Sequence, residues 1–156
     1  METEHLGGCL CGAVRFKATG EPLRAGLCHC RYCQLRTGSA FGIGVYFAHD
    51  KVEFLSGDLS SYEMTSANGN VVKIKFCGRC ATSVCWEVDT SRSAGQLGIS
   101  GGCFDPPTFW FDVDREVFTR SKAKFCMIDA KETFELHPNF APKTQDESRL
   151  DGGIKG

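Results

Sequence analysis

Seven of the ten cysteines in this chain of 156 residues fall into three short clusters. The clusters are a C-x-C pair at Cys9 and Cys11, a C-x-C-x-x-C group at Cys28, Cys30 and Cys33, and a C-x-x-C pair at Cys77 and Cys80. Thiolates at such spacings are typical ligands of zinc, and a structural zinc site takes four protein ligands in a tetrahedron. Seven ligands divide as four plus three, so the sequence predicts two zinc ions per chain with unequal numbers of protein ligands.

The two outer pairs lie far apart in the sequence, but together they can close one site of four thiolates. A glycine follows the first pair at Gly12, and another lies inside the second pair at Gly78. Glycine at these places lets backbone N–H groups turn toward the sulfurs and offset their charge. We expect this site to be structural and to contribute folding free energy, because it joins the start of the chain to its middle.

The middle cluster supplies only three sulfurs, and three protein ligands with an open fourth position are typical of catalytic zinc. The sulfur of a substrate thiol suits the open position, because a thiolate-rich zinc prefers soft ligands. Three further cysteines stand alone, at Cys85, Cys103 and Cys126, and their default role is that of small buried apolar side chains. One of them, or His29 or His5, could instead complete a closed site. The fourth ligand therefore decides between a catalytic metal and a second structural one.

Composition and charge narrow the class of protein. The chain carries 18 basic and 19 acidic residues, a net charge of −1, which argues against a partner bound through nucleic-acid phosphates. No apolar run approaches the roughly 20 residues of a membrane span, and the acidic N-terminus lacks the apolar core of a secretory signal. We therefore expect a cytoplasmic protein, in which thiols stay reduced and serve as ligands rather than as disulfides.

The elements that must position these cysteines read mostly as strands. Alternating or glycine-spaced apolar residues predict strands within residues 13–18, 41–48, 52–64, 70–77, 82–89 and 95–100. A turn is expected near Gly57 and Asp58, inside the third of these segments. Residues 30–36 predict one helical turn, which would bring Cys30 and Cys33 onto the same side. With no long helical pattern elsewhere, the chain is expected to be mainly β.

The length of the chain fits one domain, and the sequence has no internal repeat or low-complexity segment. We expect residues 1–140 to form a single zinc-binding domain. Residues 141–156 are polar and glycine-rich after Pro142 and are expected to form a C-terminal tail.

Three stretches of the sequence carry a resemblance to a known family. They are GGCLCGAVRF at residues 7–16, CHCRYCQLRTGSAF at 28–41 and FCGRCATSVCWE at 76–87. In this order they resemble the glutathione-dependent formaldehyde-activating enzyme family, which includes centromere protein V, over roughly residues 5–120. The sequence departs from the family pattern at Ala81, where a glycine commonly follows the second cysteine of the knuckle. If that position requires φ > 0, alanine adds about 1 kcal/mol of strain.

The resemblance implies a single-domain β-tent of antiparallel sheets built around a zinc site of four cysteines. It implies a structural zinc at the four outer cysteines and a catalytic zinc, which could be labile, at Cys28, Cys30 and Cys33. The implied activity is that of a zinc-dependent carbon–sulfur lyase acting on a thiol–aldehyde adduct, such as S-hydroxymethylglutathione formed from glutathione and formaldehyde. The alternative is a non-catalytic zinc module that binds a protein partner or carries metal.

A glutathione-like substrate has two carboxylates, and polar residues flank the middle cluster. Arg31 and Arg36 could clamp one carboxylate, because guanidinium groups match carboxylates bidentately. Thr37 and Ser39 could add hydroxyl contacts. The sequence leaves the true substrate, the direction of the reaction and the oligomeric state open.

Overall fold

The computed structural model describes residues 1–143, and this part of the chain folds mainly into β-strands. Eight strands form one sheet in the order β11-β10-β3-β4-β9-β8-β7-β6. Their bounds are β3 Arg24–Cys28, β4 Gly42–Ala48, β6 Leu59–Thr65, β7 Val71–Cys77, β8 Ser83–Val88, β9 Gln96–Ser100, β10 Arg115–Val117 and β11 Glu132–Thr133. A second sheet has the order β1-β2-β5 and consists of β1 Glu4–Gly8, β2 Arg15–Thr19 and β5 Val52–Ser56. The mainly β architecture predicted from the sequence is confirmed.

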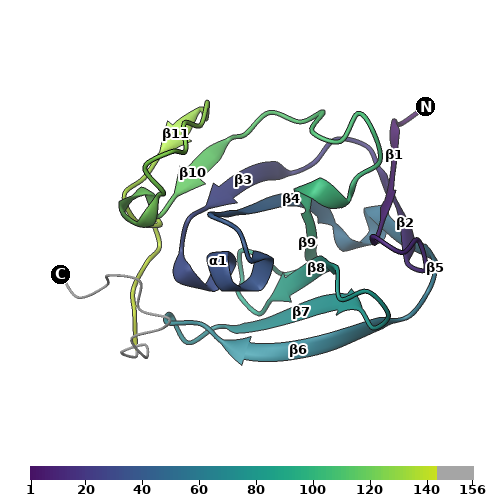
Figure 1. The fold of residues 1–156 in the computed structure, drawn as a ribbon, viewed down its shortest axis with the longest axis horizontal. Helices are drawn as coiled ribbons and strands as arrows, with labels where there is room; N and C mark the ends of the chain where they lie inside the picture. Colours follow the sequence, from purple (N-terminus) through teal and green to yellow (C-terminus); the bar gives the residue numbers. More distant parts are fainter. Residues whose placement is uncertain (144–156) are drawn as a thin grey trace.

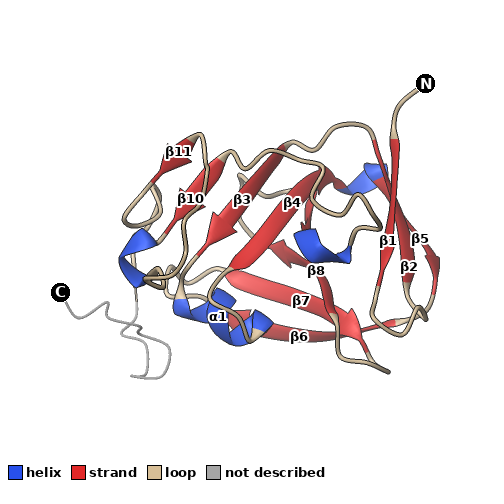
Figure 2. Ribbon diagram, turned by 45° about the horizontal axis from the view of Figure 1, so that its top comes forward, coloured by secondary structure: helices blue, strands red, loops and turns tan. Residues whose placement is uncertain are grey.

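The large sheet curves round, and the helix α1, Arg31–Thr37, lies inside the curve (Figure 1). In this view the sheet runs from β11 and β10 through β3 and β4 to β7 and β6 at the bottom. Figure 2 shows the small sheet standing at the opposite end of the molecule from β11. The strand pairs are antiparallel except that β10 runs parallel to both β3 and β11. The antiparallel sheets that the family resemblance implies are thus extended by two parallel pairings.

One face of the large sheet forms the core, because side chains alternate between the two faces of every strand. This face carries the buried side chains of Ala25, Val45, Phe47, Leu97 and Ile99. They pack with Val14, Phe16 and Ala18 in and beside β2, and with Phe104, in one continuous cluster. Each large apolar side chain buried in this way contributes about 1.5–3 kcal/mol. The core therefore holds the two sheets together and fixes the orientation of the opposite face.

The opposite face of the large sheet is rich in glycine and polar side chains. It presents Arg24, Gly26 and Cys28 on β3, Gly42, Gly44 and Tyr46 on β4, Gly98 and Ser100 on β9, and Trp86 on β8. The rings of Tyr46 and Trp86 lie over two of the glycines, since a Cβ at Gly44 or Gly98 would come within 2.9 Å of atoms in both rings. We call this surface the glycine face, and it is the face on which α1 lies.

The helix α1 is short, and both of its ends have a clear chemical cause. It begins after Cys30, whose sulfur accepts a hydrogen bond from the Cys33 N–H at 3.4 Å. It ends at Gly38, which has a left-handed φ of 64°. The helical turn predicted over residues 30–36 is therefore confirmed, displaced by one residue. None of the helices in residues 1–143 is long and apolar enough to cross a membrane.

The strand, turn and strand predicted within residues 52–64 are present as β5, a turn at Gly57 and β6, but the two strands belong to different sheets. Gly57 has a φ of 81°, and a Cβ there would lie 2.3 Å from the carbonyl oxygen of Ala13. Only glycine therefore allows the chain to cross between the sheets at this point. The sequence does not predict β1, β3, β10 or β11, of which β10 and β11 are only three and two residues long and too short to show a period.

The segment after β11 returns across the molecule to the turn between β6 and β7 (Figure 1). There the Lys143 N–H donates to the carbonyl oxygen of Ala67 at 2.7 Å, and the Ala141 N–H donates to Asn68 Oδ1 at 3.0 Å. This segment links the two edges of the curved sheet. Of the predicted tail, residues 141–143 contact this turn, and residues 144–156 lie outside the described part of the chain.

Candidate metal centres

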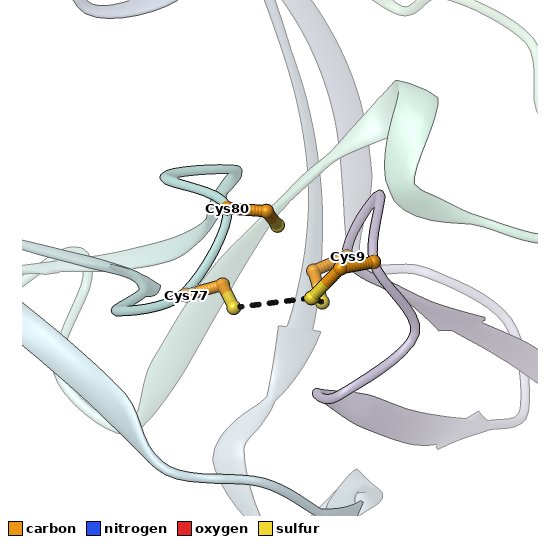
Figure 3. Close-up of side chains that lie close together, drawn as sticks. Cys9, Cys77 and Cys80 are labelled. Carbon is orange, nitrogen blue, oxygen red and sulfur yellow. Dashed lines mark hydrogen bonds between the residues drawn. The ribbon is translucent and has the colours of Figure 1, made fainter.

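The four outer cysteines converge where the two sheets meet. Cys9 and Cys11 lie in the turn between β1 and β2, and Cys77 and Cys80 lie in the turn between β7 and β8, with all four sulfurs within 4.8 Å of one another. Figure 3 shows Cys9, Cys77 and Cys80 facing a common centre. The sulfurs of Cys9 and Cys11 are 3.6 Å apart, and those of Cys11 and Cys77 are 3.9 Å apart. Tetrahedral zinc with bonds of about 2.3 Å sets neighbouring sulfurs about 3.8 Å apart, so this donor set fits zinc.

Hydrogen-bond donors lie beside the sulfurs of Cys9 and Cys80, and one of them connects the two turns. The Val14 N–H donates to the sulfur of Cys9 at 3.2 Å. The hydroxyl of Thr82 lies 3.2 Å from the sulfur of Cys80 and accepts the Leu10 N–H at 3.1 Å. Hydrogen bonds from Thr82 are the main reason why the pKa of Cys80 falls to about 5. These donors therefore favour negative charge on the sulfurs of Cys9 and Cys80.

One residue in each of the two turns adopts the left-handed backbone conformation. Gly12, which follows the first pair of cysteines, has a φ of 77°, and Ala81, which follows the second pair, has a φ of 62°. The strain expected for alanine at this position, about 1 kcal/mol, is therefore present. The Ala81 N–H donates to the carbonyl oxygen of Cys77 at 2.8 Å, which closes the turn and brings its two cysteines together.

Cys28, Cys30 and Cys33 form the second group, at the end of β3 and the start of α1, with their sulfurs within 4.8 Å of one another. All three are half-buried. Among residues 1–143, no other cysteine, histidine or carboxylate joins this group. The described part of the chain therefore supplies four ligands at one centre and three at the other.

Three neighbouring thiols do not all ionise readily without a cation, because each thiolate opposes the next. Hydrogen bonds from Cys28 and Cys30 hold the pKa of Cys33 well below its ordinary value. Hydrogen bonds to Cys30 and, next, to Cys33 raise the pKa of Cys28 well above its ordinary value. A hydrogen bond from Cys28 lowers the pKa of Cys30, but the bond to Cys33 and burial outweigh it and raise this pKa to about 12. Coordinating thiols are deprotonated by the metal, so three soft donors at this spacing suit zinc.

The two histidines considered as a fourth ligand have other partners. His29 Nε2 lies 2.8 Å from Glu116 Oε1, and both side chains are buried. His5 stacks on Trp110 with ring centroids 3.7 Å apart, and its Nε2 lies 3.1 Å from the carbonyl oxygen of Gly20. These contacts account for both residues, and neither histidine lies within the three-cysteine group.

Arg36 lies directly beside the three-cysteine group. Its guanidinium stacks over Trp86 at 4.1 Å and donates to the hydroxyl of Ser83 at 3.3 Å. A Cβ at Gly42 would lie 2.9 Å from Arg36 Nη2 and 3.5 Å from Cys33 Sγ, so both groups occupy the space that this glycine leaves. Arg36 thus brings one positive charge to the edge of the thiolate cluster.

The other predicted substrate contacts lie on or just after α1. Arg31 is the first residue of the helix and is half-buried. The hydroxyl of Thr37 donates to the carbonyl oxygen of Cys33 at 2.7 Å and accepts the Ser39 N–H at 3.2 Å. These two bonds fix the turn that follows the helix. A contact of Arg31, Thr37 or Ser39 with a substrate stays a prediction.

The sequence patterns did not single out Arg24 and Tyr46, which lie opposite each other on β3 and β4. The guanidinium of Arg24 stacks over the Tyr46 ring at 3.9 Å and donates to the amide oxygen of Gln96. Burial raises the pKa of Tyr46 above its ordinary value. Arg24 shares the glycine face with Cys28, four residues along the same strand. The alternation of β3 could have shown this, had so short a strand been recognised.

The model of the family described as glutathione-dependent formaldehyde-activating enzyme matches residues 4–121. The chain belongs to this family. The match includes both cysteine groups and ends just after β10, at the 3₁₀ turn Thr119–Ser121. Membership of the glutathione-dependent formaldehyde-activating enzyme family connects the chain with formaldehyde and glutathione chemistry.

The fold of this chain is similar to that of a Rhodobacter sphaeroides protein of known crystal structure, with a TM-score of 0.51 and 21% sequence identity. The similarity covers 68% of this chain and 95% of that one. Among curated proteins, none matches the chain.

Proposed function

We propose that the protein is a zinc-dependent carbon–sulfur lyase that acts on a thiol–aldehyde adduct, such as S-hydroxymethylglutathione formed from glutathione and formaldehyde. One observation carries the proposal: four cysteines converge at one centre, whereas the other gathers three and no further ligand from residues 1–143. Three protein ligands are the arrangement of zinc sites that bind a reactant. Family membership supports a thiol and an aldehyde as the reactants.

In this proposal Cys9, Cys11, Cys77 and Cys80 hold a structural zinc, and Cys28, Cys30 and Cys33 hold a catalytic one. When bound, the catalytic zinc would supply a place where a thiol loses its proton and becomes a nucleophile. Three thiolates and a divalent cation sum to a charge of −1. Arg36, beside Cys33, balances this charge and limits the repulsion between the cluster and an incoming thiolate.

Arg24 is well placed to bind a carboxylate of the substrate. It is half-buried on the glycine face, and its neighbours Tyr46 and Gln96 are uncharged. None of the ion pairs among residues 1–143 includes it. A guanidinium partly removed from water and lacking an anionic partner favours an anionic ligand. Arg31, Thr37 and Ser39 are proposed as further contacts at the other side of the cluster.

The same proposal treats residues 1–140 as one zinc-binding domain that works in the cytoplasm. All ten cysteines are free thiols. A reducing compartment keeps such thiols available to metal.

The test compares adduct formation with and without zinc-loaded protein, because thiols add to formaldehyde spontaneously. We expect acceleration with glutathione and loss of much of it in Arg24→Met. Removing a hydrogen bond to a charged group costs about 1.5–3 kcal/mol, so KM for glutathione should rise roughly 10-fold to 100-fold. For 2-mercaptoethanol, which has no carboxylate, KM should not change. Arg115→Met is the matched control, because that guanidinium is paired with Glu132 at 3.3 Å.

Two outcomes separate the parts of this proposal. Zinc-loaded protein that accelerates no thiol–aldehyde pair would contradict the lyase and favour a module that carries metal or binds a protein. Acceleration that is equal for glutathione and 2-mercaptoethanol, in wild type and in Arg24→Met, would keep the lyase and reject Arg24 as the carboxylate site.

A further inference from the structure

Behind the three-cysteine cluster lies a buried polar pair that the proposed chemistry does not use. In residues 1–143, the buried polar or charged residues are His29 and Glu116, at 0% and 1% exposure. His29 Nε2 donates to Glu116 Oε1 at 2.8 Å. Burying two such groups is costly, and their hydrogen bond offsets only part of this cost. The presence of a buried polar pair at this position therefore needs an explanation.

His29 is the residue between two cysteines of the cluster, and the backbone here is still extended. Cys28 ends β3, and Cys30 has φ −62° and ψ 156°. In an extended chain the side chains of residues 28 and 30 leave on one side and that of residue 29 on the other. The two sulfurs can therefore meet at one ion only while the backbone at His29 keeps this conformation.

The backbone at His29 is tied to β10 at two points. Its N–H donates to the carbonyl oxygen of Val117 at 3.1 Å, which continues the parallel pairing of Cys28 with Val117. Its side chain is bonded to Glu116, the neighbouring residue of β10. Two hydrogen bonds to adjacent residues of one strand restrict both the position and the rotation of the segment between the cysteines.

Glu116 is itself held by groups from two other segments. Lys122 Nζ lies 2.7 Å from Glu116 Oε1, and the hydroxyl of Thr133 lies 3.4 Å from Glu116 Oε2. Lys122 follows the 3₁₀ turn after β10, and Thr133 belongs to β11. The acceptor for His29 is therefore fixed from β10, β11 and the loop between them.

Packing alone does not account for a histidine at this position. His29 Nδ1 is buried and has no hydrogen-bond partner. A leucine would fill a similar volume and leave no nitrogen without a partner. What the imidazole adds is the bond from Nε2 to Glu116, and this bond offsets the cost of the second nitrogen.

We propose that His29 is a positioning residue for the three-cysteine cluster: by bonding to Glu116 it holds the backbone between Cys28 and Cys30 so that both sulfurs face one metal ion. The inference rests on the metal site of the proposed function. It concerns the affinity and geometry of that site, whatever thiol the site accepts.

The test uses two amide variants that differ in reach. In His29→Gln the amide nitrogen can occupy the place of Nε2 and donate to Glu116, whereas in His29→Asn it reaches only the place of Nδ1.

Zinc release from the loaded protein to a chromogenic chelator is followed in time. In wild type we expect a fast phase from the three-cysteine site and a slow phase from the four-cysteine site. Outer partners of metal ligands typically change affinity about 10-fold to 100-fold, so His29→Asn should speed the fast phase by at least about 10-fold. His29→Gln should stay within about threefold of wild type, and the slow phase should not change in either variant.

Cobalt gives a second readout that a general loss of stability would not move. After the labile zinc is replaced by Co²⁺, the thiolate-to-cobalt absorption band should shift in His29→Asn and match wild type in His29→Gln. If His29→Asn does not fold, Glu116→Leu, which keeps a side chain of similar size and removes both acceptor oxygens, should speed the fast phase in the same way.

Equal fast phases and equal cobalt spectra in wild type and His29→Asn, or in wild type and Glu116→Leu, would overturn the inference. A wild-type protein that releases its zinc in a single phase and binds no Co²⁺ at Cys28, Cys30 and Cys33 would overturn the proposed function instead, and this inference with it.

Discussion

At the residue scale, the two cysteine groups differ in what surrounds each sulfur. The sulfur of Cys9 receives the Val14 N–H, and that of Cys80 lies beside the hydroxyl of Thr82. Cys33 instead has the cation of Arg36 close by. The described contacts of the outer group are thus uncharged donors, whereas the middle group, which also has the Cys33 N–H on the sulfur of Cys30, has a cation beside it. This difference suits one permanent site and one exchangeable site.

Cys30→Ser should therefore mainly affect catalysis, and Cys77→Ser should mainly affect stability. Cys30→Ser should abolish the acceleration of adduct formation by the protein and change the melting temperature by less than about 4 °C, the effect of roughly 1 kcal/mol in a domain of this size. Cys77→Ser opens the four-sulfur site that carries folding free energy, and should lower stability by several kcal/mol, or about 10 °C. Calorimetry with zinc analysis checks both, and two variants that merely unfold would refute the division into catalytic and structural metals.

Ala81→Gly should stabilise the protein, because Ala81 has a φ of 62°. Relief of the left-handed strain, about 1 kcal/mol, is partly offset by the greater freedom of glycine in the unfolded chain. We expect a rise in melting temperature of about 1–4 °C.

Gly12→Ala is the matched control for this variant, because Gly12 has a φ of 77° and no atom lies within 4 Å of the place of its Cβ. It should lower the melting temperature by a similar amount. A lower melting temperature in Ala81→Gly would show that the alanine methyl makes a contact that stabilises the protein by more than the strain destabilises it.

At the element scale, the glycines of the large sheet decide which side chains can lie on its glycine face. Gly44 and Gly98 leave room for the rings of Tyr46 and Trp86, and Gly42 leaves room for Arg36 and Cys33. The rings in turn carry the guanidiniums of Arg24 and Arg36. Residues with no side chain thus place aromatic and cationic groups beside the three-cysteine cluster.

Gly44→Ala should destabilise the protein, because its Cβ would lie 2.8 Å from the Trp86 ring and 2.9 Å from the Tyr46 ring. Overpacking of this kind costs about 1–3 kcal/mol. Gly26→Ala is the control, since Gly26 pairs with Gly44 on the same face and its Cβ would approach only a backbone oxygen, at 3.7 Å. In urea unfolding, Gly44→Ala should lose this free energy of unfolding and Gly26→Ala almost none. Equal losses in the two variants would mean that the rings can move aside.

At the scale of the whole molecule, the four-cysteine site would act as a crosslink when it holds a metal ion. It joins the β1–β2 turn of the small sheet to the β7–β8 turn of the large one, beside the core that both sheets share. The three-cysteine site lies elsewhere, on the glycine face of the large sheet, where α1 also lies. Loss of metal from the two sites should therefore have separate effects on folding.

Graded chelation should reveal two steps. A moderate chelator should remove one zinc per chain, with loss of the acceleration of adduct formation and little change in the far-ultraviolet circular dichroism. A stronger chelator, or chelation in mild denaturant, should remove the second zinc and unfold the chain, because binding free energy at a structural site is folding free energy. Simultaneous loss of both ions and of the fold would contradict the separation.

Local signals in the sequence determined the cysteine groups, most of the long strands and the turn of helix at Cys30. Cluster spacing and alternation act over a few residues, so they can be read along the chain. The strain at Ala81 was expected only from the family resemblance and only if its position requires φ > 0, and the φ of 62° meets that condition.

Only the tertiary structure decided what each side chain meets across the sheet. Strand order places β10 beside β3, and therefore Glu116 behind His29, although these residues are far apart in the sequence. Strand pairing also sends β5 and β6, which follow each other in the sequence, into different sheets, because β5 pairs with β2 and β6 with β7. The physical reason is that strand pairing and burial depend on the hydrogen bonds and apolar contacts of distant segments, which no local pattern records.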